Sequence, residues 1–251
     1  MTLNADEVID VLAADPAGTG IFTDFDGTLS EIVDRPESAQ PVPGAAETLE
    51  ALSGRFGLVA VVSGRSLDDL RWRLSPNGVV LAGSYGRERS DRSTGRRRVE
   101  GWETVALAAA AMIRELAGVV LERKGAGVAL HYRSAPELEP EARRIAETLA
   151  VEFELDVLHG RLVVELVRPG PGKGDAVAAL ASEHDLQTVF VAGDDVADLE
   201  AFDWARAAPA RSVLVAVASE EAPPTLESMA DLVVAGPAEL VVLLRRLVAA
   251  V

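Results

Sequence analysis

Short apolar runs alternate with helical patterns in the first and last thirds of the chain. Apolar runs, each bounded by Gly, Asp or Ser, lie at 20–25, 58–62, 79–82, 188–192 and 212–217. Apolar residues at helical spacing are found over 45–54, 67–74, 175–184, 198–207 and 237–250. This alternation of strands and helices is typical of βα units on a parallel sheet. We therefore predict an α/β fold with a doubly wound, Rossmann-like sheet.

The middle of the chain has a different pattern, with paired strand-like runs after each helical stretch. The elements expected there are helices over 103–116 and 136–151 and strands over 119–124, 127–133, 154–158 and 162–167. We expect the hairpin turns at Gly125-Ala126 and His159-Gly160. The order αββαββ predicts an antiparallel sheet with helices on one face. We therefore expect a core domain at 1–87 and 171–251, with an inserted α+β cap domain at 88–170.

Composition limits the classes of protein to which this chain can belong. Of its 251 residues, 49% are hydrophobic and 25% are charged, which provides for a sizeable core and excludes a disordered chain. Acidic residues outnumber basic ones by 40 to 24, for a net charge of −16. Such a chain repels a phosphate backbone, so we expect no nucleic-acid partner. The arginine-rich tract from Arg87 to Arg98 could serve as an anion-binding arm, but its turn residues favour a solvated linker.

Cysteine usage and apolar run lengths indicate where the protein works. The chain has no cysteine, so disulfides and thiolate chemistry are excluded and an intracellular location is the default. The N-terminal segment is polar and acidic, unlike a signal peptide. The longest apolar run, Val105–Ile113, has nine residues, against the roughly 20 that cross a bilayer. We expect a cytoplasmic monomer with no membrane partner.

The strongest chemical signal is Asp24-Phe25-Asp26-Gly27-Thr28, at the end of the first apolar run. In parallel sheets, ligands bind beyond the carboxyl ends of the strands. The i, i+2 spacing places both aspartates on one side of the strand end, and glycine permits a sharp turn close to a ligand. A lone carboxylate there is often a helix cap, whereas a pair followed by Gly-Thr favours a site.

A second acidic cluster, Gly193-Asp194-Asp195, follows the apolar run 188–192. Carboxylates beside a phosphate would repel it unless a cation is present, and the arrangement predicts Mg²⁺, which prefers oxygen ligands. The residues expected at this metal are Asp24, Asp26, Asp194 and Asp195. Asp198 either completes the coordination or is the N-cap of the helix that follows.

Two further segments carry groups suited to binding phosphate. Ser63-Gly64-Arg65 ends a predicted strand and offers a hydroxyl, backbone N–H groups and a guanidinium. Lys173 lies between two glycines just before a predicted helix. A lysine on a solvated turn is the alternative, but the flanking glycines allow a ligand to approach closely, which favours a phosphate contact.

These motifs, in this order, resemble those of the haloacid dehalogenase-like phosphatases. The resemblance rests on DFDGT, SGR, the Gly-Lys-Gly segment and GDD, and spans most of the predicted core. It implies that Asp24 is a nucleophile forming an aspartyl-phosphate and that Asp26 is the general acid and base. It also implies that Ser63 and Lys173 bind the phosphoryl oxygens. The Mg²⁺ would lie between Asp24, the backbone carbonyl of Asp26 and Asp194.

Segments of core and cap together are similar to trehalose-6-phosphate phosphatases. They are Gly83–Gly86, Leu121–Gly125, Leu130–Arg133, Val164–Gly174 and Gly193–Phe202. The resemblance implies a Mg²⁺-dependent hydrolase that releases trehalose and phosphate from a sugar phosphate. The residues that it implies near the sugar are Arg65, Glu122, Lys124, His131, Arg133 and Glu165.

Three positions depart from the family pattern. Tyr85 stands where the family usually has the histidine of GSHG, and Ala197 and Leu199 replace the threonine and glutamate of GDDxTDE. The nucleophile, the acid and the GDD motif are retained, so hydrolysis is still expected. Two alternatives are a phosphatase for a different sugar phosphate and a non-catalytic sugar-phosphate-binding module.

Overall fold

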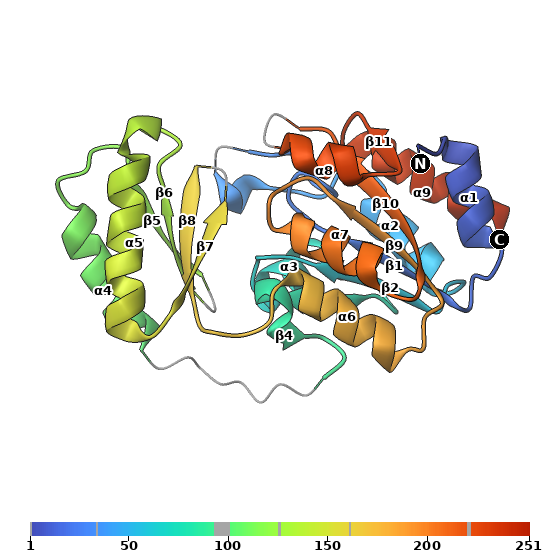
Figure 1. Ribbon diagram of the computed structural model, residues 1–251, viewed down its shortest axis with the longest axis horizontal. Helices are drawn as coiled ribbons and strands as arrows, with labels where there is room; N and C mark the ends of the chain where they lie inside the picture. Colours follow the sequence, from blue (N-terminus) through green and yellow to red (C-terminus); the bar gives the residue numbers. More distant parts are fainter. Residues whose placement is uncertain (1, 34, 93–100, 125–126, 161, 220–221) are drawn as a thin grey trace. The chain divides into compact units, whose positions relative to one another are not determined.

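The computed structural model describes residues 2–33, 35–92, 101–124, 127–160, 162–219 and 222–251 (Figure 1). The chain forms two compact units: residues 1–93 with 171–251, and residues 94–170. Here they are named the core unit and the cap unit. Among the helices that the structure describes, none combines the length and the apolarity that crossing a bilayer requires.

The core unit is built on a sheet whose strands run in the order β11-β10-β9-β1-β2-β3-β4. Its strands are β1 (Thr19–Thr23), β2 (Leu58–Val62), β3 (Val80–Gly83), β4 (Glu88–Arg89), β9 (Thr188–Gly193), β10 (Arg211–Val217) and β11 (Leu232–Val234). All neighbours pair in parallel except β3 and β4. Central β1 pairs with β2 on one side and β9 on the other. The carboxyl ends of these three strands therefore meet at one edge.

Helices cover both faces of this sheet. They are α1 (Ala5–Ala13), α2 (Ala45–Ser53), α3 (Leu67–Arg73), α6 (Lys173–Glu183), α7 (Asp198–Ala207), α8 (Pro224–Met229) and α9 (Pro237–Ala250), with 3₁₀ turns η1 (Pro36–Ser38) and η2 (Ser84–Gly86). Ile21 of β1 packs with residues of α1, α2, α3 and α9. Its neighbour Phe22 points to the other face and packs with residues of α6, α7 and α8. This alternation confirms the predicted doubly wound sheet.

The cap unit has the predicted order αββαββ. Its elements are α4 (Trp102–Ile113), β5 (Val120–Lys124), β6 (Gly127–His131), η3 (Pro136–Leu138), α5 (Glu139–Phe153), β7 (Asp156–Gly160) and β8 (Val163–Val167). The strands form an antiparallel sheet in the order β5-β6-β8-β7. One face of the sheet packs its apolar residues, among them Leu130 and Leu166, against α4 and α5. Polar residues of the other face are therefore left for a ligand or solvent.

Some elements differ from those that the sequence predicts. Strand β7 continues through Gly160, which pairs with Val163, so the predicted turn at His159-Gly160 is wrong. Leu162 lies in the left-handed region, at a φ of +58°. The predicted turn at Gly125-Ala126 and residues 93–98 of the arginine-rich tract lie outside the described residues. Strand β4, at 88–89, pairs with the core sheet, and the domain boundary at 87/88 stays a prediction.

Candidate active site

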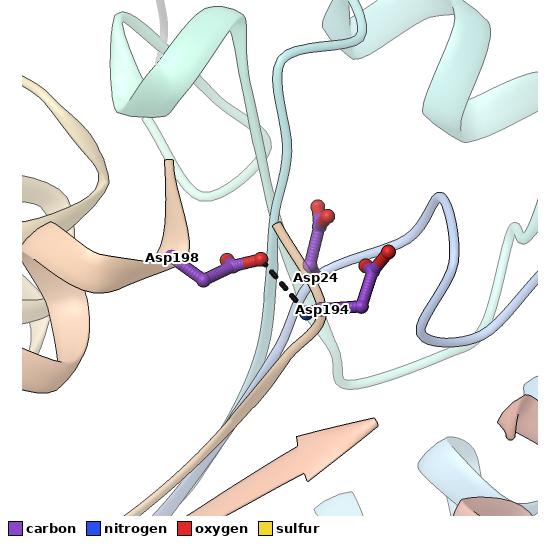
Figure 2. A group of neighbouring side chains, drawn as sticks. All are labelled: Asp24, Asp194 and Asp198. Carbon is purple, nitrogen blue, oxygen red and sulfur yellow. Dashed lines mark hydrogen bonds between the residues drawn. The ribbon is translucent and has the colours of Figure 1, made fainter. Parts of the chain in front are cut away.

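The ends of β1 and β9 bring Asp24 and Asp194 together. The backbone N–H of Asp24 donates to the carbonyl of Ala192, which continues the parallel pairing one residue past β1. Figure 2 shows Asp24 and Asp194 beside Asp198, the first residue of α7. One carboxylate oxygen of each of these three buried aspartates lies within 4.8 Å of the others. Three oxygens at this spacing can hold one cation between them.

Lys173 places an ammonium against this group. It is the first residue of α6, and only 3% of it is exposed. Its Nζ lies 3.0 Å from Oδ2 of Asp24 and 2.8 Å from Oδ1 of Asp198. This ammonium therefore neutralises part of the negative charge that would otherwise repel a phosphate.

Burial disfavours the ionised form of the aspartates in this group. It raises the pKa of Asp24 to about 6, even though the Lys173 ammonium lowers it. Burial also raises the pKa of Asp194 well above its ordinary value, and neighbouring Asp195 adds to this shift. Among the described residues, the buried Oδ1 of Asp24 has no hydrogen-bond partner. An all-oxygen site with excess negative charge and an unsatisfied acceptor fits a hard divalent cation such as Mg²⁺.

Two hydroxyl groups and a glycine surround the carboxylate of Asp194. The hydroxyl of Thr28 donates to its Oδ1 at 3.0 Å, and that of Ser219 lies 3.4 Å from its Oδ2. Gly27 has a φ of +72°, and a Cβ built there would lie 1.9 Å from Oδ2 of Asp194. Glycine is therefore required for both the backbone conformation and the close approach of the carboxylate.

Asp198 closes the loop after β9 instead of capping α7. Its Oδ2 accepts the backbone N–H groups of Asp194 and Asp195, while its Oδ1 accepts from Lys173. The N-cap residue is Ala197, so the N-cap reading of Asp198 is wrong. Oδ1 of Asp195 accepts the N–H groups of Ala197 and Asp198 at the start of α7. The carboxylate of Asp195 lies outside the group of three, and its place at a metal stays a prediction.

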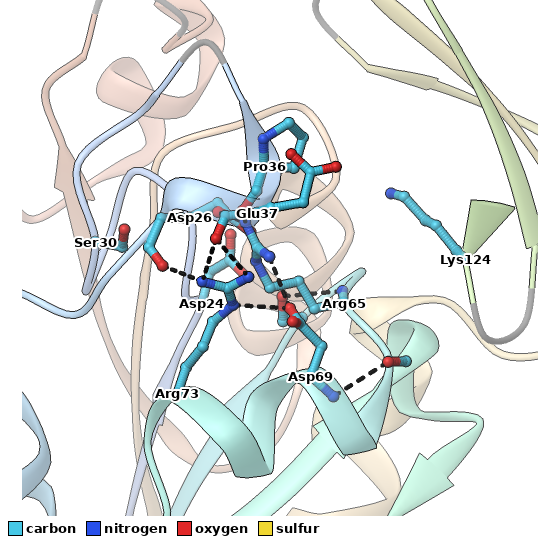
Figure 3. A network of polar contacts seen from close by, with 12 residues as sticks. Asp24, Asp26, Ser30, Pro36, Glu37, Arg65, Asp69, Arg73 and Lys124 are labelled. Atoms are coloured by element: carbon cyan, nitrogen blue, oxygen red, sulfur yellow. Dashed lines mark hydrogen bonds and ion pairs between the residues drawn. The ribbon is translucent and has the colours of Figure 1, made fainter. Parts of the chain in front are cut away.

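Asp26 is bound to Arg65. Nε and Nη2 of Arg65 donate to Oδ2 and Oδ1 of Asp26 at 2.6 and 2.7 Å, two parallel bonds that Figure 3 shows. The guanidinium also lies over the ring of Phe25, 5.3 Å from its centroid. Burial lowers the pKa of Arg65, but the hydrogen bonds and charges of Asp26 and Asp69 raise it above the ordinary value overall. The carboxylate of Asp26 is 43% exposed and does not belong to the group of three.

Ser63 lies at the carboxyl end of β2, beside β1. It is buried, and its hydroxyl accepts the backbone N–H of Arg65 at 3.2 Å. Its carbonyl accepts the N–H of Tyr85, whose hydroxyl would lie 2.7 Å from a Cβ built at Gly64. Tyr85, which replaces the usual histidine, therefore packs directly on the predicted phosphate-binding turn.

Four of the five predicted cap residues share the face of the cap sheet that the helices leave uncovered. They are Glu122, Lys124, His131 and Glu165. Nε2 of His131 lies 2.8 Å from Oε2 of Glu122, and the ammonium of Lys124 donates to Oε1 of Glu165. The fifth, Arg133, is half-buried in the turn after β6. The cap unit therefore has acidic and basic side chains together on one face of its sheet.

Asp69 contacts Arg65 but belongs to none of the sequence motifs. Asp69, on α3, accepts from Nη1 of Arg65 at 2.7 Å. Helical spacing does not predict this contact, because Arg65 precedes α3 and its N-cap Ser66 and reaches Asp69 in the first turn of the helix.

A family model matches most of this sequence. The model described as trehalose-phosphatase covers residues 22–237, which include Asp24, Ser63, Lys173 and Asp194. The chain belongs to the trehalose-phosphatase family. Family membership confirms the resemblance that the motifs indicated.

The chain is also similar to individual curated proteins. A probable trehalose-phosphate phosphatase of Sinorhizobium fredii is 32% identical, and the match covers 77% of this chain and 76% of that protein. An uncharacterized glycosyl hydrolase of Mycobacterium tuberculosis is 39% identical over 74% of this chain. This chain spans only 15% of that hydrolase.

Solved structures share the fold of this trehalose-phosphatase family member. The C-terminal domain of C. albicans trehalose-6-phosphate phosphatase matches with a TM-score of 0.78 and 21% identity, over 100% of this chain and 99% of that one. A haloacid dehalogenase-like hydrolase from Bacteroides thetaiotaomicron matches with a TM-score of 0.60 and 17% identity, over 91% and 98% of the two chains. At these identities the likeness shows the fold.

Proposed function

We propose that the protein is a Mg²⁺-dependent phosphatase that releases trehalose and phosphate from trehalose 6-phosphate through an aspartyl-phosphate on Asp24. The observation that carries this proposal is the buried carboxylate of Asp24, 3.0 Å from the ammonium of Lys173 and grouped with Asp194. The relatives named as trehalose-phosphate phosphatases support the choice of substrate. A cytoplasmic location and a monomeric state stay predictions from the sequence.

Two displacements at phosphorus would carry the reaction. In the first, a carboxylate oxygen of Asp24 attacks phosphorus and the bond to the sugar oxygen breaks. Asp26 would enter this step protonated, with one of its two bonds from Arg65 released, and would give that proton to the sugar oxygen. In the second, water attacks phosphorus, Asp26 takes a proton from the water, and the bond to Asp24 breaks. Asp24 and Asp26 thereby return to their starting states.

The surrounding groups would hold the phosphoryl group and its charge. Lys173 contributes an ammonium and Ser63 a hydroxyl to the phosphoryl oxygens. Asp24, Asp194 and the backbone carbonyl of Asp26 would hold the Mg²⁺, which supplies charge neutralisation and orients the phosphoryl group when bound. Thr28, by its hydrogen bond to Asp194, keeps that ligand in place.

The uncovered face of the cap sheet would recognise the sugar. A polar sugar requires several donors and acceptors that converge on it, and this face presents two carboxylates, an ammonium and an imidazole. Among the described residues, the buried Oε2 of Glu165 has no hydrogen-bond partner, and a sugar hydroxyl would supply one. Arg133 is proposed to add a donor from the turn beside this face.

A substrate panel with and without metal tests the proposed function. We expect phosphate release from trehalose 6-phosphate that falls to background in EDTA and returns with Mg²⁺. The reason is that Lys173 alone does not balance the carboxylates of Asp24, Asp194 and Asp198. Glucose 6-phosphate and other hexose phosphates serve as the comparison and should react at least about tenfold more slowly. Faster release from another sugar phosphate would reject the substrate, and release that EDTA leaves unchanged would reject the metal. Binding without release would indicate a non-catalytic module.

Glu122→Ala should separate sugar recognition from phosphate chemistry. Loss of a charged hydrogen-bond acceptor on the cap face is expected to lower kcat/KM for trehalose 6-phosphate by about 10- to 100-fold. Hydrolysis of p-nitrophenyl phosphate, which lacks a sugar, should change less than about twofold. The matched control is Arg123→Ala, because Arg123 follows on the same strand and pairs with Glu103. Equal losses on both substrates would contradict the assignment of this face to the sugar.

A further inference from the structure

Arg65 bridges two carboxylates of the core unit. Its Nε and Nη2 donate to Asp26, and its Nη1 donates to Asp69 at 2.7 Å. Nη2 also donates to the carbonyl of Pro36 at 2.9 Å. All three guanidinium nitrogens therefore donate to oxygens of the protein itself, and the side chain is 11% exposed.

Asp69 is itself held in place from two directions. Its backbone N–H donates to the hydroxyl of Ser66, the N-cap of α3. Its Oδ2, which accepts from Arg65, also accepts from Nε of Arg73 at 2.9 Å. Burial opposes ionisation of Asp69, but the hydrogen bonds from Arg73 and Arg65 lower its pKa below the ordinary value. Asp69 is therefore an ionised, oriented acceptor for the guanidinium of Arg65.

Arg73 extends the chain of contacts back to the loop that follows the DFDGT motif. Its side chain is 3% exposed, and its Nη1 donates to the carbonyls of Glu37 and Ala39. The dashed lines in Figure 3 join Asp26, Arg65, Asp69 and Arg73 in one network. The network therefore fastens Arg65 both to α3 and to the segment around η1.

Two parallel hydrogen bonds from one rigid guanidinium fix the plane of a carboxylate as well as its position. Arg65 thus sets the direction in which the carboxylate of Asp26 faces, and Asp69 sets the position of Arg65. The resemblance to trehalose-6-phosphate phosphatases implies Arg65 near the sugar. All three guanidinium nitrogens donate to protein oxygens in this structure, and a contact of Arg65 with the sugar stays a prediction.

We propose that Asp69 is a positioning residue for proton transfer by Asp26 and acts through Arg65. This inference rests on the proposed function, in which Asp26 handles the protons. Removing an outer partner of a reacting group typically lowers activity by about 10- to 100-fold, because small displacements of that group are costly.

The test compares Asp69→Asn with Asp68→Asn. Asp68 is the neighbouring residue of α3, is 86% exposed and pairs only with Arg71, at 3.7 Å, among the described residues. We expect Asp69→Asn to lower kcat for trehalose 6-phosphate about tenfold while KM changes less than about twofold. Asp68→Asn should leave both values unchanged, and Asp69→Glu, which keeps the charge, should recover most of the loss. A kcat for Asp69→Asn within twofold of that of Asp68→Asn would overturn the proposal.

The leaving group distinguishes positioning from general damage to the site. Nitrophenolate leaves without a proton, so the initial burst from p-nitrophenyl phosphate should keep its rate in Asp69→Asn while the later steady rate falls. A burst that slows as much as the steady rate would mean structural damage and would overturn the proposal. Thermal unfolding of the variants provides a parallel check on folding.

A double variant tests whether Asp69 acts through Arg65. In an Arg65→Gln background, Asp69→Asn should lower kcat by less than a further twofold, because the connecting guanidinium is already absent. A full tenfold further loss would overturn the proposed route. Failure of the proposed function itself is recognised separately, since the unaltered protein would then release no phosphate from trehalose 6-phosphate or would react faster with another sugar phosphate.

Discussion

Asp24→Asn is expected to lower phosphate release from trehalose 6-phosphate by about 1,000-fold or more. An amide has no anionic oxygen to attack phosphorus, and loss of a covalent nucleophile is among the most damaging changes to an enzyme. The fold should be retained, because the side chain keeps its size. Burial already raises the pKa of Asp24 to about 6, so a neutral group at this position costs little stability. Phosphate release and thermal unfolding measured on the same sample check both expectations.

Asp203→Asn is a suitable control for this variant, since Asp203 is an exposed residue of α7. It should keep the activity of the unaltered protein. If Asp24→Asn retained a tenth of that activity, Asp24 would not be the nucleophile.

Lys173→Met is expected to remove activity and to lower the free energy of unfolding by about 3 kcal/mol. The ammonium lies 3.0 Å from Asp24 and 2.8 Å from Asp198, and both carboxylates are buried. Methionine fills a similar volume but leaves these carboxylates without their cation. The phosphoryl group would also lose a positive charge in the transition state, so kcat should fall by about 100-fold or more.

Urea unfolding, monitored with and without Mg²⁺, measures the stability effect of Lys173→Met. Added Mg²⁺ should recover part of the lost stability, because it would supply positive charge beside the same carboxylates. A variant as stable as the unaltered protein would show that the ammonium does not hold the carboxylates together. A kcat within tenfold of normal would remove Lys173 from the phosphate site.

The position of Asp24 beside Asp194 could be predicted from the sequence because it follows from a general rule of parallel sheets. Both residues follow apolar strands that are buried at every position except Thr188, and the carboxyl ends of such strands lie at one edge. The hydrogen bonds of Asp195 and Asp198 and the ion pair of Asp198 could not be derived in this way. They depend on the hydrogen bonds among residues 194–198 and on the contact of Asp198 with Lys173, which is distant in sequence.

The cap face was predicted only in part for a similar reason. Glu122 and Lys124 alternate along one strand, so their common face follows from the period of a β-strand. The pairing of Lys124 with Glu165 depends in addition on the register of β6 against β5 and β8. The turn was predicted at Gly160 because glycine often marks a turn, whereas here Gly160 belongs to β7 and pairs with Val163.

Helix α1 and strand β11 of the core unit were not predicted. Helix α1 begins with a capping box between Asn4 and Glu7, and buries Val8 and Leu12 at helical spacing. These signals are readable but span only nine residues, a length at which periodicity is weak. Strand β11 has three residues and is defined by its pairing with β10, which no local pattern reports.

The central claim is that Asp24 carries the phosphoryl group between the two displacements. The most direct test uses trehalose 6-phosphate that carries a radiolabel in its phosphate. The reaction is quenched rapidly with acid, and the labelled peptide is then mapped. The predicted result is label on the peptide that contains Asp24, released by hydroxylamine and absent from the Asp24→Asn variant. Label on a peptide without Asp24, or turnover with inverted configuration at phosphorus and no labelled peptide, would contradict the account.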